Sequence, residues 1–90
     1  MNKNELIEEI AKQADISKSK AAEALGAFIN AVETTLKKRQ DVVIAGFGTF
    51  TAVDRAARTA RNPRTGEAVQ VQAVRVPKFR AGTKLKESVQ

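Results

Sequence analysis

The sequence predicts an α+β fold with two N-terminal helices, a three-stranded antiparallel sheet that carries an extended basic β-arm, and a short C-terminal helix. Three observations support this prediction. Apolar residues recur at helical spacing as far as about residue 38, and from Asp41 onward β-branched residues, glycines and alternation replace that pattern. Between Arg55 and Gly66, four arginines stand three residues apart without an intervening acid. The only large apolar residue there is Pro63, which suits a protruding arm better than a central strand.

The first helix is expected to begin after Asn2, which can cap it, because Glu5 follows three residues later. Leu6, Ile7, Ile10, Ala11 and Ala14 then recur at helical spacing, and the segment 15–17 ends this helix and caps the next.

The second helix is expected from Lys18 to Lys38. One apolar stripe runs along it, formed by Ala21, Leu25, Phe28, Ile29, Val32 and Leu36. Gly26 beside that stripe weakens the helix by roughly 1 kcal/mol relative to alanine. The sequence therefore predicts close packing of another backbone against Gly26.

The second half of the chain reads as strands. The β-branched segment 42–44, the glycine-bounded turn 46–48 and the alternating segment 49–53 predict a hairpin. Beyond the arm, the apolar residues shift from odd-numbered to even-numbered positions near Ala73, so the face of the strand must change there, which predicts a bulge or bend. Pro77 is expected to stop the strand. Gly82 permits a turn, and residues 84–89 can form the terminal helix.

At 90 residues, one domain spanning residues 1–90 is expected. Its parts are a helical body with the first hairpin (1–54), the arm and return strand (55–76), and the C-terminal helix (77–90). Without the arm, the chain is too short to cover its apolar residues, so an obligate dimer with a shared core is predicted. The expected dimer core comprises Leu25, Phe28, Ile29, Val32, Leu36, Ile44, Phe47, Phe50 and Phe79.

Charge is concentrated in one region of a chain whose formal net charge is +6. Residues 1–54 hold seven basic and eight acidic residues, whereas residues 55–86 hold nine basic residues and only Glu67 as an acid. Such a regional excess predicts a polyanionic partner.

Several classes of site and location are excluded by composition. The chain has no cysteine and no histidine, so no disulfide, thiolate metal site or histidine-based catalysis is expected, and no metal or other cofactor is implied. No apolar run approaches a membrane span, and the first residues do not resemble a signal peptide. A soluble cytoplasmic protein without membrane contact is expected.

The arm can be interpreted from physical principles alone. On a two-stranded arm, arginines three residues apart present charge on both faces and can follow a groove between two phosphate walls. Arginine also suits a narrow minor groove, where the base pattern is degenerate, so sequence preference should be weak and tied to DNA deformability. Nicked, gapped or bent DNA should therefore bind better than intact duplex.

Three ordered motifs resemble those of one known family. They are Gly46–Phe50 (Gly-Phe-Gly-Thr-Phe), Arg61–Gly66 (Arg-Asn-Pro-Arg-Thr-Gly) and Pro77–Gly82 (Pro-Lys-Phe-Arg-Ala-Gly). With these motifs, nearly the whole chain is similar to the bacterial histone-like HU proteins, within the HU and integration host factor family.

This resemblance implies an intertwined dimer whose two β-arms embrace double-stranded DNA through the minor groove and serve nucleoid organisation. Pro63 would wedge between base pairs and Asn62 would shape the tip, while the arm arginines Arg55, Arg58, Arg61 and Arg64 would hold phosphates and groove edges. A second set on the dimer body could extend the DNA footprint: Lys3, Lys18, Arg75, Arg80, Lys84 and Lys86. Whether the dimer is homotypic or pairs with a paralogue stays open.

The chain departs from the family pattern at four places. Thr83 stands where a basic residue is common, Ala60 replaces a frequent glycine, and Arg64 adds a charge where a neutral polar residue is usual. The last change predicts stronger phosphate binding near the tip. Arg39 stands in a segment that lacks the glycine often found after the second helix, which leaves the end of that helix undefined.

Other functions fit the sequence less well than DNA bending. The two opening helices superficially resemble a helix-turn-helix, but the second is too long and apolar to read base edges. A small nuclease would need Mg²⁺ ligands, for which Asp15, Glu23, Glu33, Asp41 and Asp54 show no metal-ligand spacing. Gly46–Gly48 fits hairpin packing better than a phosphate cradle. RNA remains open as a secondary ligand, and a solvated charge run without a ligand is the plainest alternative.

Overall fold

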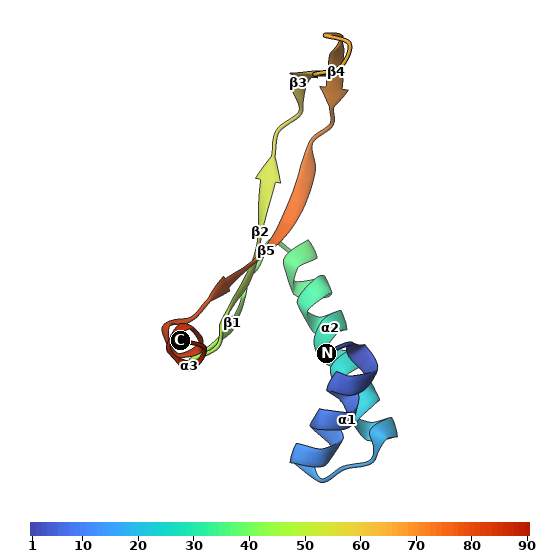
Figure 1. Ribbon diagram of the computed structural model, residues 1–90, viewed down its shortest axis with the longest axis vertical. Coiled ribbons are helices and arrows are strands. Elements are labelled where there is room, and N and C mark those ends of the chain that lie inside the picture. The colour runs from blue at the N-terminus through green and yellow to red at the C-terminus, as the bar shows by residue number, and fades with distance from the viewer. The chain divides into compact units, whose positions relative to one another are not determined.

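The computed structural model describes residues 1–90 and has the predicted α+β fold, with two compact units, Met1–Thr35 and Leu36–Gln90. Figure 1 shows the elements in chain order. They are α1 (Lys3–Ala14), α2 (Lys18–Lys37), β1 (Val42–Ile44), β2 (Gly48–Arg55), β3 (Arg58–Arg61), β4 (Ala68–Val71), β5 (Val74–Ala81) and α3 (Thr83–Ser88). The single domain over residues 1–90, with its three parts, stays a prediction.

Local capping defines both ends of α1 and the start of α2, as the sequence predicts. The Glu5 amide donates to Asn2 Oδ1 at 2.8 Å, and α1 ends at Asp15, whose φ of 55° is left-handed. The Lys20 amide donates to Ser17 Oγ at 3.1 Å at the start of α2. These contacts satisfy amide groups that a helix start leaves without partners.

The second unit is built on an antiparallel sheet in the order β1-β2-β5. Phe50 of β2 lies opposite Val42 of β1 and Phe79 of β5. The Phe79 ring lies 4.9 Å from the Phe50 ring and 5.4 Å from the Phe47 ring, between ring centres. The three aromatic rings thus form one cluster on the sheet.

The glycine-bounded turn between β1 and β2 has a clear steric cause. Gly46 has a φ of 81°, and the Phe47 amide donates to the Ile44 carbonyl at 3.0 Å. A Cβ atom on Gly48 would lie 2.4 Å from the Phe79 ring and 2.6 Å from the Arg80 carbonyl oxygen. Only glycine lets β5 approach β2 this closely.

The arm extends the pair formed by β2 and β5. Residues 56–57 and 72–73 interrupt the strands on both sides, and β3 and β4 then pair as a separate two-stranded sheet. The bulge or bend predicted near Ala73 corresponds to this interruption, and the predicted change of face stays a prediction. In the outer part, Arg58 lies opposite Val71, and Arg61 lies opposite Ala68.

One sequence-based expectation is wrong, and another is not met within the single chain. Pro77 does not stop the strand, because β5 continues to Ala81 with Pro77 opposite Ala52. Since β5 is an edge strand, one row of its backbone groups has no ladder partner, and a proline is tolerated there. At Gly26, a Cβ atom would meet nothing within 4 Å in this chain, so close packing of another backbone against it stays a prediction.

The single chain encloses almost no core. Only Ala11 and Ala21 are buried apolar residues, and no large side chain is fully buried. Among the residues predicted for the dimer core, Phe28, Ile29, Phe47 and Phe79 keep 38–44% of their surface exposed. The others in that set, Leu25, Val32, Leu36, Ile44 and Phe50, are partly buried.

Candidate nucleic-acid interface

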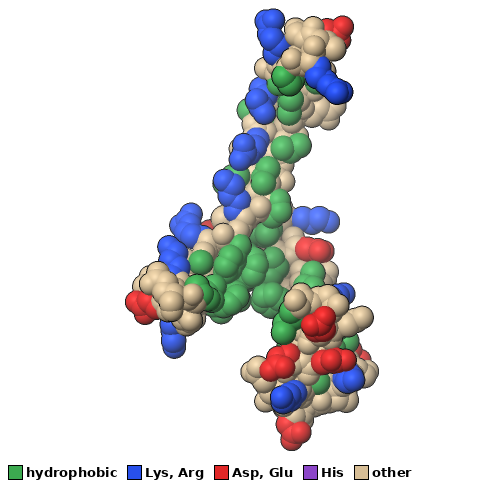
Figure 2. Space-filling view, viewed as in Figure 1, with side chains coloured by type: hydrophobic (Ala, Val, Ile, Leu, Met, Phe, Trp, Pro, Cys, Tyr) green, Lys and Arg blue, Asp and Glu red, His purple; other side chains and the backbone are tan.

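The arm carries its four arginines from the root to the tip. Arg55 ends β2, Arg58 and Arg61 begin and end β3, and Arg64 stands in the turn at the tip. All four are exposed. Because side chains alternate along a strand, Arg58 and Arg61 lie on opposite faces of the arm. Figure 2 shows basic side chains along the arm and at its tip, so positive charge follows its whole length.

Backbone hydrogen bonds fix the turn at the tip. The Asn62 amide donates to the Glu67 carbonyl at 2.8 Å, and the Gly66 amide donates to the Asn62 carbonyl at 2.7 Å. The Asn62 side chain accepts a further hydrogen bond from the Arg64 amide at 2.9 Å. Gly66 has a φ of 74°, which favours glycine.

This arrangement leaves Pro63 at the apex, directly after Asn62, with its ring exposed. Proline has no amide hydrogen, and its rigid ring presents an apolar edge without a polar group to desolvate. The tip therefore combines an apolar point with Arg61 and Arg64 on either side.

The six body residues divide between the two units. Lys3 and Lys18 begin α1 and α2 in the first unit, and Lys18 Nζ lies 3.6 Å from Glu8 Oε1. The second unit holds the other four, with Arg75 and Arg80 on β5 and Lys84 and Lys86 on α3. The four arm arginines thus follow the β-arm from root to tip, whereas the six body residues are divided between the two units.

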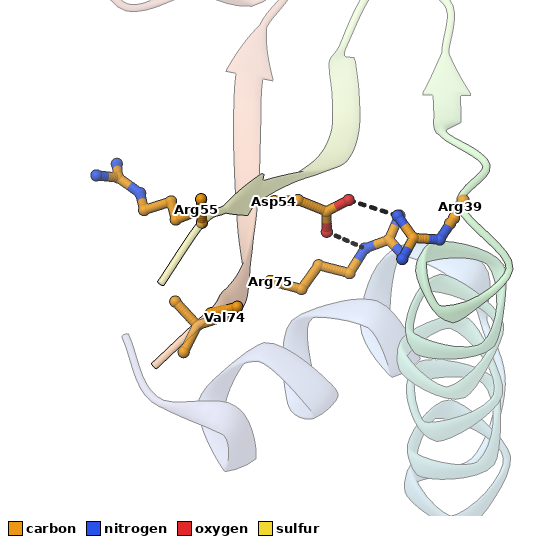
Figure 3. A pocket seen from close by; sticks show the side chains of 7 residues that line it. Arg39, Asp54, Arg55, Val74 and Arg75 are labelled. Carbon is orange, nitrogen blue, oxygen red and sulfur yellow. Dashed lines mark hydrogen bonds and ion pairs between the residues drawn. The ribbon is translucent and has the colours of Figure 1, made fainter. Parts of the chain in front are cut away.

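An ionic cluster at the root of the arm was not predicted from the sequence. Asp54, directly before Arg55, forms an ion pair with Arg39, and its other oxygen lies 3.8 Å from Nε of Arg75 (Figure 3). Arg39 has a φ of 62°, a left-handed conformation that glycine adopts more readily than arginine. This segment is the one that lacks the glycine often found in the family after the second helix. The only sequence clues were that missing glycine and a single acid next to the basic arm.

The carboxylates considered for Mg²⁺ do not form a cluster. No three acidic residues lie close enough to hold a metal ion together. Asp41 instead accepts a hydrogen bond from Thr51 Oγ1 at 2.7 Å, Glu23 lies 3.8 Å from Lys20 Nζ, and Asp54 is paired with arginines. No helix has the length and apolar character needed to span a membrane.

Comparison with known proteins assigns the chain to a family. The family model described as bacterial DNA-binding protein matches residues 1–90. DNA-binding protein HU-beta of Salmonella typhimurium is 54% identical over 89 residues, which cover 99% of both chains. DNA-binding protein HU of Neisseria meningitidis serogroup B is also 54% identical over 89 residues, covering 99% of this chain and 100% of the other.

Solved structures give the same result. A cocrystal structure of Anabaena HU with DNA matches with a TM-score of 0.88 and 37% identity, over 99% of this chain and 97% of the other. HU from Thermotoga maritima matches with a TM-score of 0.70 and 30% identity over the full length of both chains.

Proposed function

Because the chain belongs to the bacterial DNA-binding protein family, we propose that it is an architectural protein that bends and compacts double-stranded DNA with little sequence preference. The family and the relatives described above are named for DNA binding and not for catalysis, and the chain is not an enzyme. The observation that carries the proposal is the extended arm with arginines on both faces and an apolar apex. We expect the protein in the cytoplasm, on the nucleoid.

The acting form is proposed to be an intertwined dimer. Phe28 and Ile29 expose neighbouring apolar side chains in the first unit, as do Phe47 and Phe79 in the second, and exposed apolar patches mark interaction surfaces. A second copy, or a closely related paralogue, would bury these side chains in a shared core and supply a second arm. Two arms can embrace a duplex from both sides, whereas one arm can only lie against it.

Each arm is proposed to enter the minor groove. Arg58 and Arg61 face opposite sides of the arm and can reach the phosphates of both groove walls, with Arg55 at the root and Arg64 at the tip. The minor-groove base pattern distinguishes mainly A·T from G·C pairs. Binding should therefore depend on groove width and deformability rather than on base sequence.

Pro63 is proposed to wedge between base pairs and kink the duplex. Asn62 holds the turn that presents it, through the hydrogen bond from the Arg64 amide. Unstacking one base step takes on the order of a few kcal/mol, which a nick or gap already provides in part. Interrupted DNA should therefore bind more tightly than intact duplex.

The body residues are proposed to contact DNA that bends back from the arms. Lys3, Arg80, Lys84 and Lys86 form no ion pair within this chain, whereas Lys18 and Arg75 have acidic neighbours. RNA is a candidate secondary ligand, because phosphate contacts alone do not separate the two polymers.

The test is fluorescence anisotropy with one arbitrary duplex and the same duplex carrying a nick, each titrated over a range of salt concentrations. We expect both to bind, with log affinity falling by about 0.9 per log unit of salt for each phosphate neutralised on intact duplex. The nicked duplex should bind more tightly, and Pro63→Ala should remove that difference. Pro77→Ala, the same change within β5, is the matched control and should keep it.

Each possible result of the anisotropy experiment bears on a different part of the proposal. Equal affinity of the unaltered protein for both duplexes would reject wedging while leaving the DNA grip intact. Absence of duplex binding would reject the proposed function. Strong preference for one unrelated duplex over another would favour a sequence-specific regulator instead.

A further inference from the structure

The root of the arm holds three guanidinium groups and one carboxylate. Asp54 lies opposite Arg75 in the β2–β5 register, and the next pair is Arg55 with Val74. Arg39 reaches Asp54 from the loop before β1 (Figure 3). Asp54 therefore bridges two arginines that come from different segments of the same unit, and the group as a whole keeps a net positive charge.

Arg55 is oriented differently from the other two arginines. Its side chain extends away from Asp54, on the other side of the strand pair (Figure 3). This follows from the alternation of side chains along β2, since Asp54 and Arg55 are neighbours. At the root, Arg55 is thus open to a phosphate, whereas Asp54 engages Arg39 and Arg75.

The bridging carboxylate leaves these two arginines incompletely satisfied. The Arg39 and Asp54 side chains are 67% and 56% exposed, and a pair this exposed contributes little to stability. Nε of Arg75 is buried without a hydrogen-bond partner, because Asp54 Oδ1 is 3.8 Å away. A hollow of about 440 Å³ adjoins these side chains, with Ala56 and Ala73 also lining it. There is space at this point for a larger anion.

We propose that Arg39 and Arg75 form a latent phosphate subsite at the root of the arm, and that Asp54 acts as an internal counter-ion that holds both arginines off the DNA backbone. The inference rests on the proposed function, since the phosphates are those of bound duplex. Asp54 then limits the number of phosphates that one arm neutralises. Loss of its charge should extend the DNA footprint from Arg55 to this site.

The experiment measures the salt dependence of duplex binding for Asp54→Asn. Freed from the carboxylate, each arginine that gains a phosphate should steepen the slope of log affinity against log salt by about 0.9. For each phosphate gained, the affinity advantage of the variant should grow about twofold on every halving of the salt concentration. Asp54→Thr, which also removes the charge and suits a strand, should behave the same way.

Asp41→Asn is the matched control. It removes one negative charge from the same unit, but Asp41 bonds to Thr51 rather than to an arginine, and asparagine can still accept that hydrogen bond. If general charge explains the effect, Asp41→Asn and Asp54→Asn will have equal slopes, and that result would overturn the proposal.

A double-mutant cycle assigns the effect to the subsite. Arg39→Gln alone should leave the slope unchanged, because Asp54 already engages Arg39, whereas in the Asp54→Asn background it should remove about 0.9 from the slope. Equal effects of Arg39→Gln in both backgrounds would contradict the counter-ion role. Failure of the unaltered protein to bind duplex would reject the proposed function itself, and thermal unfolding of each variant verifies that it is folded.

Discussion

At the scale of single residues, Gly48 is the position where steric demand is clearest. An alanine Cβ would overlap the Phe79 ring and the Arg80 carbonyl oxygen, both within 2.6 Å. Because the backbone atom cannot swing aside, Gly48→Ala should lower the free energy of unfolding by about 1–3 kcal/mol.

Gly26→Ala is the matched control. Nothing lies within 4 Å of its Cβ, so it should stabilise α2 by up to about 1 kcal/mol. Chemical denaturation of both variants measures this contrast, and a Gly48→Ala protein as stable as the parent would contradict it.

Residues that act through their near neighbours could be predicted from the sequence, because the cause lies within a few positions. Asn2 caps α1, and Ser17 bonds to the Lys20 amide as expected. The pairing of Arg39 with Asp54 could not be predicted in this way. It joins residues fifteen positions apart and depends on a left-handed conformation that arginine rarely adopts.

At the scale of elements, the arm combines a row of positive charges with a defined turn at its tip. Arg64 lies in the tip turn and is exposed, and its amide, not its side chain, bonds to Asn62. Arg64→Gln should therefore keep the turn but lose one phosphate contact, which would lower the salt slope of duplex binding by about 0.9 and weaken binding. Lys12→Gln, in the last turn of α1, removes the same charge far from the arm in sequence and should leave the slope unchanged. An unaltered affinity and slope for Arg64→Gln would refute a role at the tip.

The order and type of the elements followed from local patterns, including the interruption of the arm near Ala73. The end of β5 could not be predicted from local patterns, and Pro77 shows why. Whether a proline ends a strand depends on whether that strand lies at the edge of its sheet, which is a property of the assembled sheet and not of the neighbouring residues.

At the scale of the whole molecule, the main question is what covers the apolar side chains that a single chain leaves exposed. A 90-residue chain with only Ala11 and Ala21 as buried apolar residues has too small a core to account for a stable fold. The predicted shared core explains why Ile29, Phe47 and Phe79 remain open in one chain. Composition predicted the need for a partner, but no pattern within one sequence identifies whether that partner is a second copy or a paralogue.

If the dimer is obligate, its unfolding must depend on protein concentration, because folding and association are then one equilibrium. A hundredfold increase in concentration should stabilise the dimer by about 2.7 kcal/mol. For two 90-residue chains, this should raise the unfolding midpoint by roughly 5–10 °C.

Ile29→Glu should abolish the dimer in sedimentation, because it would place a charge in the shared core. Val43→Glu, at a side chain that is already 71% exposed, should leave dimer and midpoint nearly unchanged. A midpoint independent of concentration, together with a monomeric mass, would show that these apolar faces have another partner than a second chain.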